Sequence, residues 1–231
     1  MADLTAPAVA GDLLVVPLGA TEQHGPHLPL GTDTIIAAAL VDELDAVIAP
    51  ALPYGASGEH EGFPGTLSIG RAALEHVLVE LGRSAPFDRL LFVSAHGGNA
   101  EAVAAAVTTL RAEGRDVRAW SPRWRSAAAP PPRSAAALPA APDAHAGRTE
   151  TSLMLALAPE LVGPARERGN VAPLAELMPR LRAEGVRAVS PNGVLGDPTG
   201  ASAAEGRALL AAARADLAAF VAAWRADGGA A

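Results

Sequence analysis

This 231-residue chain contains no cysteine and no lysine. The first absence excludes disulfides, zinc fingers, iron–sulfur clusters and thiol nucleophiles. The second excludes lysine chemistry of both the Schiff-base and the P-loop kind, because all 18 basic residues are arginine. Any catalysis by this chain must therefore come from other groups.

Long apolar runs, a signal-like N-terminal segment and a surplus of positive charge are also lacking. No run approaches the ~18 apolar residues of a membrane span, and residues 1–12 have neither a basic start nor a long apolar stretch. The net charge of −7 argues against a nucleic-acid partner. We therefore expect a cytoplasmic protein without nucleic-acid or membrane partners. The length is short for two domains, so we expect a single domain over residues 1–231.

Short apolar runs and helical patterns alternate along the chain. Four apolar runs are typical of strands, at 13–18, 46–49, 89–95 and 116–120. Apolar spacing and capping patterns predict helices over 33–44, 72–84, 101–113, 151–157 and 203–225. Thr32 is expected to cap the first of these helices, and Ser202 with Glu205 forms a capping box for the last. This alternation predicts an α/β fold with a mainly parallel sheet covered by helices on both faces.

Two segments depart from the alternation because they are rich in proline. Residues 121–142 are mostly Ala, Pro, Ser and Arg, so they can bury little and are expected to form a mobile surface loop. A tolerated insertion and a lid over the site both remain open for this loop. Residues 160–200 carry five prolines and are also expected to be irregular, either draped over the sheet or forming a subunit contact.

Acidic and histidine side chains gather just after predicted strands or at the start of predicted helices. In open parallel sheets, ligands bind beyond the carboxyl ends of the strands. A set of carboxylates and imidazoles without thiols suits Zn²⁺, Fe²⁺ or Mn²⁺. Three such motifs occur, namely Glu22 and His24 with Asp33, then His96, then His145 with Glu150.

Each of these residues also has a purely structural interpretation. Glu22 and His24 could form a salt-bridged loop, and His96 alone could be a structural histidine. Asp33 and Glu150 could be first-turn carboxylates favoured by the helix dipole. The remaining histidines are not assigned a direct role: His27 is expected to support the site or the fold, His60 to lie outside the reaction, and His76 to be a surface or core residue.

Two other catalytic schemes fit the sequence poorly. His96-Gly97-Gly98 is similar to the oxyanion-hole loop of lipases and esterases, but the chain has no G-x-S-x-G nucleophile motif. No G-x-G-x-x-G follows a predicted strand, so dinucleotide binding lacks its fingerprint.

Four ordered motifs resemble the creatininase family of metal-dependent amidohydrolases. They are LGATEQHGPHLPLGTD at 18–33, FPGTLS at 63–68, HGGN at 96–99 and HAGRTETS at 145–152. Three further stretches resemble a peptidase branch of that family, which trims the C-terminal end of a modified precursor peptide during biosynthesis of a redox cofactor. They are YGASGEH at 54–60, RGNVAPL at 168–174 and GVLGDPT at 193–199.

The resemblance implies a fold, a cofactor and a set of site residues. The fold would be a three-layer α/β/α sandwich with a mainly parallel central sheet, assembled into a homo-oligomer. The cofactor would be a divalent metal, two ions per chain, with Zn²⁺ or Fe²⁺ favoured and Mn²⁺ open. By position, the metal ligands would be Glu22, His24, Asp33, His96 and Glu150, with Asp33 bridging the ions. His145 would be the catalytic acid or base, and Ser57, Gly97 and Gly98 would contact the substrate.

The sequence departs from creatininase itself at two places that shape the pocket. There the strand-end motif is His-Tyr-Glu-Asn, whereas here glycines stand at 97 and 98, and residues 140–144 have no aromatic side chain. A more open pocket suits a peptide end better than a small flat ring. The expected function is thus metal-dependent hydrolysis of an amide or peptide bond in a modified precursor peptide. Creatinine hydrolysis, formamide hydrolysis and a metal-free scaffold in a biosynthetic complex are the alternatives.

Overall fold

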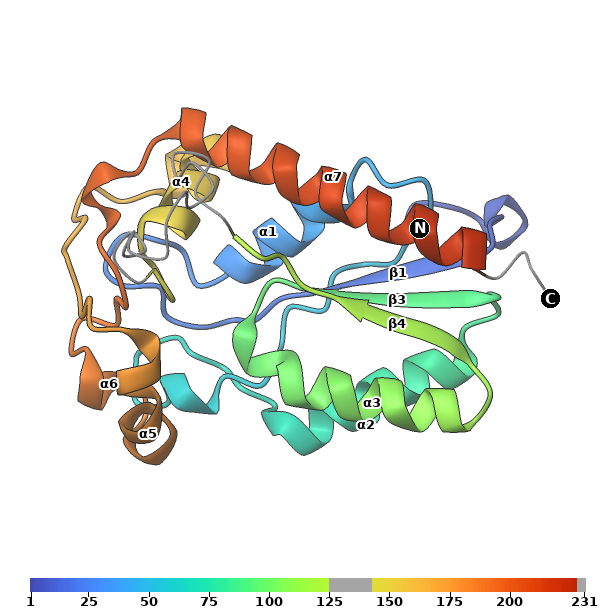
Figure 1. Ribbon diagram of the computed structural model, residues 1–231, viewed down its shortest axis with the longest axis horizontal. Coiled ribbons are helices and arrows are strands. Elements are labelled where there is room, and N and C mark those ends of the chain that lie inside the picture. Colours follow the sequence, from blue (N-terminus) through green and yellow to red (C-terminus); the bar gives the residue numbers. More distant parts are fainter. Residues whose placement is uncertain (125–142, 228–231) are drawn as a thin grey trace, which may run out of the picture.

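A parallel sheet forms the centre of the computed structural model, which describes residues 1–124 and 143–227. Within these residues the sheet has four strands in the order β2-β1-β3-β4, and every pairing is parallel (Figure 1). The strands are β1 (Leu13–Leu18), β2 (Val47–Ile48), β3 (Arg89–Ser94) and β4 (Asp116–Trp120). The predicted strands are confirmed, although the second is only two residues long.

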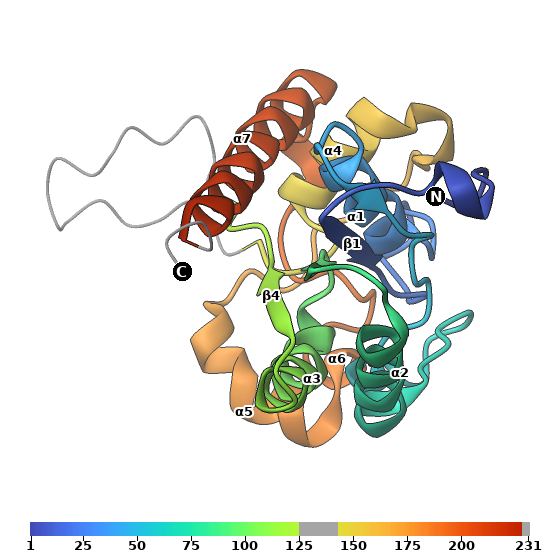
Figure 2. The ribbon, with the colours of Figure 1, turned by 90° about the vertical axis from the view of Figure 1, so that its right-hand side faces the viewer.

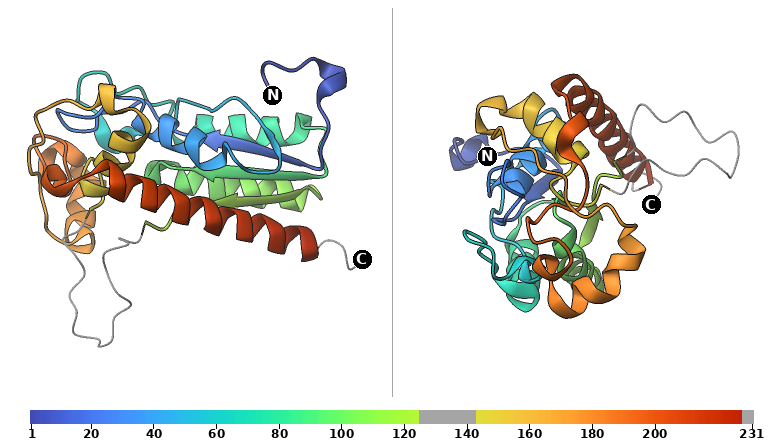
Figure 3. Two further views of the ribbon diagram at one scale, coloured as in Figure 1. Left: turned by 90° about the horizontal axis from the view of Figure 1, so that it is seen from above. Right: turned by 90° about the vertical axis from the view of Figure 1, so that its left-hand side faces the viewer.

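Helices cover both faces of this sheet, which gives three layers. The sheet is the middle layer. The outer layers are α1 (Thr32–Val41), α4 (Arg148–Leu157) and α7 (Ala203–Asp227) on one face, and α2 (Gly70–Ser84) and α3 (Ala100–Ala112) on the other. Figure 2 shows the two sets of helices on opposite sides of the strands, and Figure 3 shows α7 running alongside the sheet. The α/β/α sandwich is therefore confirmed.

Side-chain alternation along β1 divides the core into two apolar clusters. Leu13 and Val15 pack with the helices of the first face, whereas Leu14, Val16 and Leu18 pack with α2 and α3. Successive residues of a strand point to opposite faces, so a strand covered on both sides must be apolar throughout. That requirement explains the uninterrupted apolar run that predicted this strand.

The two predicted helix caps are only partly as expected. Gly31 stands at the N-cap of α1, while Thr32 is its first helical residue and donates a hydrogen bond to the carbonyl of Pro29 at 2.7 Å. Ser202 does cap α7, because its Oγ accepts from the backbone N–H of Glu205 at 3.2 Å. The Glu205 carboxylate does not complete the box, since it accepts hydrogen bonds from Arg148 and Ser152 of the adjacent α4 instead.

The proline-rich stretch 160–200 is more ordered than expected. It contains α5 (Leu174–Glu184) and the short α6 (Val186–Val189), which lie near the carboxyl ends of the strands (Figure 1). Pro173 immediately precedes α5, where a missing N–H costs no helical hydrogen bond, and Pro179 alone lies inside it. The number of prolines was therefore a misleading signal, because most of them lie outside the helices.

Three further expectations concern single segments. The loop predicted over 121–142 falls almost wholly outside the described residues. His76 is exposed on α2, in agreement with a surface role. None of the helices in residues 1–124 and 143–227 combines the length and the apolar character needed to cross a bilayer.

Candidate functional site

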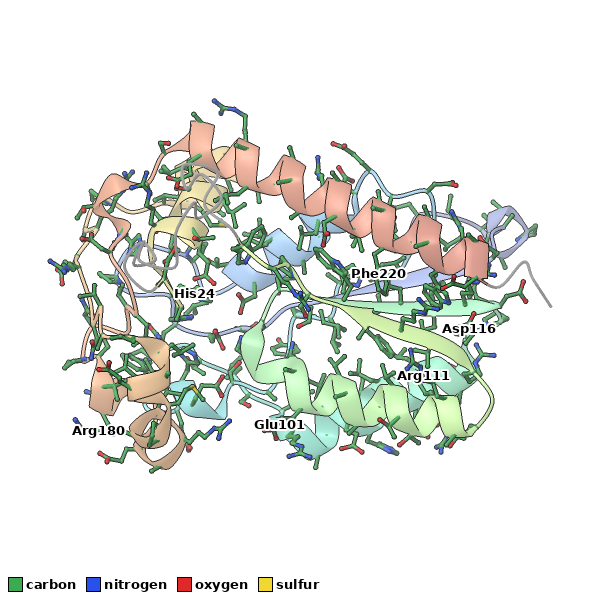
Figure 4. The ribbon with its side chains drawn as sticks, viewed as in Figure 1. His24, Glu101, Arg111, Asp116, Arg180 and Phe220 are labelled. Atoms are coloured by element: carbon green, nitrogen blue, oxygen red, sulfur yellow. The ribbon has the colours of Figure 1, made fainter. Side chains whose placement is uncertain are left out.

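The carboxylate and histidine side chains singled out by the sequence meet at the carboxyl edge of the sheet. Because β1 and β3 are parallel neighbours, the loops after them open at the same edge. Figure 4 shows His24 at this end of the molecule. Five of the six predicted residues are less than 10 % exposed and the Glu150 side chain is 16 % exposed; the six are Glu22, His24, Asp33, His96, His145 and Glu150.

One group of possible ligands consists of Glu22, Asp33 and His96. Nδ1 of His96 lies 3.2 Å from Oε1 of Glu22 and 3.3 Å from Oδ2 of Asp33. Nε2 of His96 lies 3.2 Å from the carbonyl oxygen of Ala56, which can only accept a hydrogen bond, so the ring proton belongs on Nε2. Nδ1 is therefore the ring nitrogen that a metal ion can take, and it faces the two carboxylates; without a metal these carboxylates raise the pKa of His96 well above its ordinary value.

A second group consists of His24, His145 and Glu150, beside the other oxygen of Asp33. Nε2 of His24 lies 3.4 Å from Oδ1 of Asp33 and 3.8 Å from Oε2 of Glu150. In each group one ligand atom per residue can be chosen so that all lie within 4.8 Å of one another. Asp33 thus turns one oxygen toward His24 and the other toward His96, so it could contribute to an ion in either group.

Several polar atoms of these groups make no hydrogen bond although they are buried. They are both oxygens of Glu22, Nε2 of His24 and Oδ2 of Asp33. An unsatisfied buried polar atom costs about 1–3 kcal/mol, and more when it is charged. A divalent cation in each of the two groups would give these atoms partners, so the residues present fit the expected metal.

The pKa values in this cluster show the same excess of negative charge. Burial lowers the pKa of His24, but the carboxylates of Asp33, Glu150 and Glu22 outweigh burial and raise it to about 10. Burial and the negative charge of Asp33 raise the pKa of Glu150 to about 7, because together they outweigh the opposite effect of the positive charge on His24. His24 and, below about pH 7, Glu150 therefore hold protons in the site, and a divalent cation would displace them.

Two buried residues join this site that the sequence had not assigned to it. His60 is 4 % exposed, and its Nε2 lies 3.5 Å from Oε1 of Glu22. Its ring centroid is 4.3 Å from that of His145. Gln23 contacts both of these histidines through its side-chain nitrogen. The YGASGEH stretch was a signal for His60, whereas Gln23 offered only its place between two predicted ligands.

His27 lies apart from the ligand groups and supports the fold. Its Nε2 lies 2.8 Å from Oγ1 of Thr151, which ties the loop after β1 to α4. Burial, with Arg166 and His24 nearby, lowers the pKa of His27 to about 4. This placement agrees with the expected supporting role.

The three residues expected to contact substrate lie in different surroundings. A Cβ at Gly97 would meet no atom within 4 Å, whereas one at Gly98 would lie 2.4 Å from the Ala56 carbonyl oxygen and from a Glu59 carboxylate oxygen. Only glycine therefore fits at 98. Ser57 is fully buried, with Oγ 3.4 Å from Nε2 of His96.

A cavity of about 270 Å³ opens beside the ligand groups. Its described lining includes Gly97, His96, His145 and Glu150, but neither Ser57 nor Gly98. Trp124 also lines it, so the cavity has one aromatic wall that the sequence argument had not placed.

Comparison with known proteins gives the same family as the motifs. The family model of creatininase, creatinine amidohydrolase, matches residues 1–221. The mycofactocin precursor peptide peptidase of Mycolicibacterium smegmatis is 54 % identical over 212 residues, which are 86 % of this chain and 80 % of that protein.

Solved structures agree with this relationship. A crystal structure of creatinine amidohydrolase (creatininase) has a TM-score of 0.67 and 27 % identity, covering 90 % of this chain and 88 % of that one. A mutant creatininase of the Zn-Zn type has a TM-score of 0.65 and 28 % identity, covering 90 % and 89 %. The chain belongs to the creatininase family and is a hydrolase of amide bonds.

Proposed function

We propose that this chain is a metal-dependent peptidase that removes residues from the C-terminal end of the modified mycofactocin precursor peptide. The observation that carries this proposal is the buried, unsatisfied ligand set opening on a cavity beside Gly97, where no atom of the described residues lies within 4 Å of the place that a Cβ would take. The relative from Mycolicibacterium smegmatis, named as a peptidase of this precursor, supports the choice of substrate.

The proposed cofactor is a pair of divalent ions, Zn²⁺ or Fe²⁺, with Mn²⁺ as a third option. Asp33 would contribute to both ions. Glu22 and His96 would complete one ligand group, and His24 and Glu150 would complete the other. When bound, such ions supply Lewis-acid activation of water and of the amide carbonyl. The Zn-Zn type creatininase structure supports this choice of metal.

His145 is the proposed acid–base residue. Burial, together with the positive charge of His24, holds the pKa of His145 well below its ordinary range, so the ring is neutral. A neutral imidazole at the edge of the cavity can accept a proton from the attacking water. It then delivers that proton to the leaving amine, as general acid–base catalysis requires.

The proposal extends to the state of the whole protein. We propose a single domain over 1–231 that forms a homo-oligomer in the cytoplasm. Light scattering coupled to gel filtration tests the oligomer, and a monomeric mass would refute it.

Ser57 does not line the described cavity. We therefore propose that it supports the ring of His96, while Gly97 lies next to the peptide.

The deciding experiment offers metal-loaded protein both candidate substrates. We expect mass spectrometry to show a shortened modified peptide, with little turnover of creatinine, and we expect a chelator to stop the cleavage. Brisk creatinine turnover beside an intact peptide would instead favour creatinine hydrolysis. Less than one ion per chain after mild purification, with no turnover of either substrate, would favour a metal-free scaffold.

A further inference from the structure

The side-chain amide of Gln23 is held in one orientation by two backbone groups. Oε1 accepts a hydrogen bond from the N–H of Gly25 at 2.9 Å, and Nε2 donates to the carbonyl of Gly193 at 3.1 Å. Exchanging the oxygen and the nitrogen would break both bonds. The residue is 5 % exposed, so water does not offer an alternative partner. The amide nitrogen therefore has one hydrogen left to donate.

That remaining hydrogen determines the tautomer of His60. Nε2 of Gln23 lies 2.8 Å from Nδ1 of His60, so this ring nitrogen is the acceptor. In a neutral imidazole the proton must then sit on Nε2, the atom 3.5 Å from Oε1 of Glu22. His60 consequently turns an N–H toward the carboxylate.

The backbone of Gln23 determines the tautomer of His145. Here the ring turns its bare nitrogen, not its N–H, toward the site. Nε2 of His145 lies 2.7 Å from the carbonyl oxygen of Gln23, which only accepts, so Nε2 carries the proton. The 3.1 Å contact between the two Nε2 atoms is not a hydrogen bond, because both hydrogens of the amide are already donated. Nδ1 of His145 is left bare, 3.7 Å from Oε1 of Glu22.

We propose that Gln23 is a positioning residue that sets these two tautomers, so that His60 enters the site as a hydrogen-bond donor and His145 as a proton acceptor at Nδ1. His60 then orients the Glu22 carboxylate and is not a metal ligand. The three atoms of Glu22, His60 and His145 that lie close enough to hold an ion do not form a third cation site, because one of them carries a hydrogen. The catalytic part of this inference rests on the proposed function, but the tautomers do not.

Nitrogen NMR of protein labelled with ¹⁵N-histidine and loaded with zinc tests the tautomers without any substrate. We expect both His60 and His145 to be neutral with the proton on Nε2, while His76, which is exposed to solvent, serves as the reference. In Gln23→Glu, which cannot donate, the acceptor signal of His60 Nδ1 should disappear. A wild-type His60 with a bare or zinc-bound Nε2 would overturn the proposal even if no variant folds. Unchanged His60 signals in Gln23→Glu would overturn the role of Gln23.

Two substitutions of His60 separate a donor from a ligand. Gln at this position keeps an N–H near the place of Nε2, whereas Met keeps the bulk and removes the donor. We expect both variants to retain their metal, with kcat about 10- to 100-fold lower for His60→Met and largely rescued in His60→Gln, since a hydrogen bond to a charged group is lost only in the former. Loss of metal from both variants would make His60 a ligand. Failure of the wild type to cleave the peptide would refute the proposed function and leave the NMR result standing.

Discussion

Asp33 occupies a special position among the site residues because each of its oxygens faces a different histidine. Oδ1 lies 3.4 Å from His24, and Oδ2 lies 3.3 Å from His96. The residue sits in the first turn of α1 and belongs to neither apolar cluster. Its loss should therefore affect metal binding far more than the fold.

We predict that Asp33→Ala removes most of the bound metal and nearly all activity while the circular-dichroism spectrum stays native. Elemental analysis of the purified variant measures the metal. Asp42→Ala, which removes an exposed carboxylate just after the same helix, is the matched control and should keep both metal and turnover. Normal metal content with normal turnover in Asp33→Ala would remove this residue from the ligand set.

His145→Ala should behave differently from a ligand variant. Because we assign its bare Nδ1 to proton transfer, we predict retention of metal and a fall in kcat of about 10²–10⁴-fold, the range typical of general acid–base catalysis. Metal stoichiometry and single-turnover rate should be measured on the same sample, with His76→Ala as the control for loss of a histidine. A variant that loses its metal would place His145 among the ligands, and an unchanged rate would make it structural.

The packing of α4 on α7 is the element-scale feature that supports the site. α4 carries Glu150, and the backbone of α7 comes close to the backbone of α4 at Gly206. A Cβ at Gly206 would lie 1.9 Å from the backbone carbonyl oxygen of Ser152 and 2.9 Å from the N–H nitrogen of Leu153. Because those atoms are backbone, one of the two helices would have to move.

We predict that Gly206→Ala lowers the free energy of unfolding by about 1–3 kcal/mol, the usual cost of overpacking. Gly58→Ala is the matched control, since a Cβ there meets nothing within 4 Å, and it should change stability by less than about 0.5 kcal/mol. Chemical denaturation of both variants measures the difference. Equal stabilities would show that the two helices can separate without cost.

For the whole molecule, metal binding and folding stability should be linked through pH. Without metal, His24 has a pKa of about 10, above its ordinary 6.5, so its contribution to stability is complete below pH 6.5 and is lost as pH rises toward 10. The pKa of Glu150 is raised to about 7, so its proton is lost in the same direction. Each lost proton changes the unfolding free energy by up to about 1.4 kcal/mol per pH unit.

We predict that the difference in Tm between zinc-loaded and chelated protein widens as pH rises from about 6.5 to about 9. Deprotonation of His24 and Glu150 destabilises the metal-free protein. A cation binds the same two groups in their deprotonated form, so the metal-loaded protein is not destabilised in this way. Differential scanning calorimetry at constant zinc activity measures both curves. A difference that stays constant or narrows would show that these groups do not bind the metal.

The sequence alone determined the features that depend on local pattern. The apolar run at 13–18 was typical of a strand buried on both faces, and the alternation with helices led to a parallel sheet. Parallel strands place their carboxyl ends together, so the sequence alone predicts that Glu22 and His96 lie at one edge of the sheet. The family resemblance then supplied the roles that the pattern could not.

Only the tertiary structure decided which atoms face one another. Pro173 and Pro179 pointed to irregular chain, yet α5 forms, because one proline precedes the helix and the other is tolerated inside it. His60 carried no periodicity that would place it beside Glu22, 38 positions away. Hydrogen bonds between distant segments, such as those of Gln23 with His60 and Gly193, orient each ring. Side-chain direction and tautomer depend on such long-range contacts, and local sequence does not specify them.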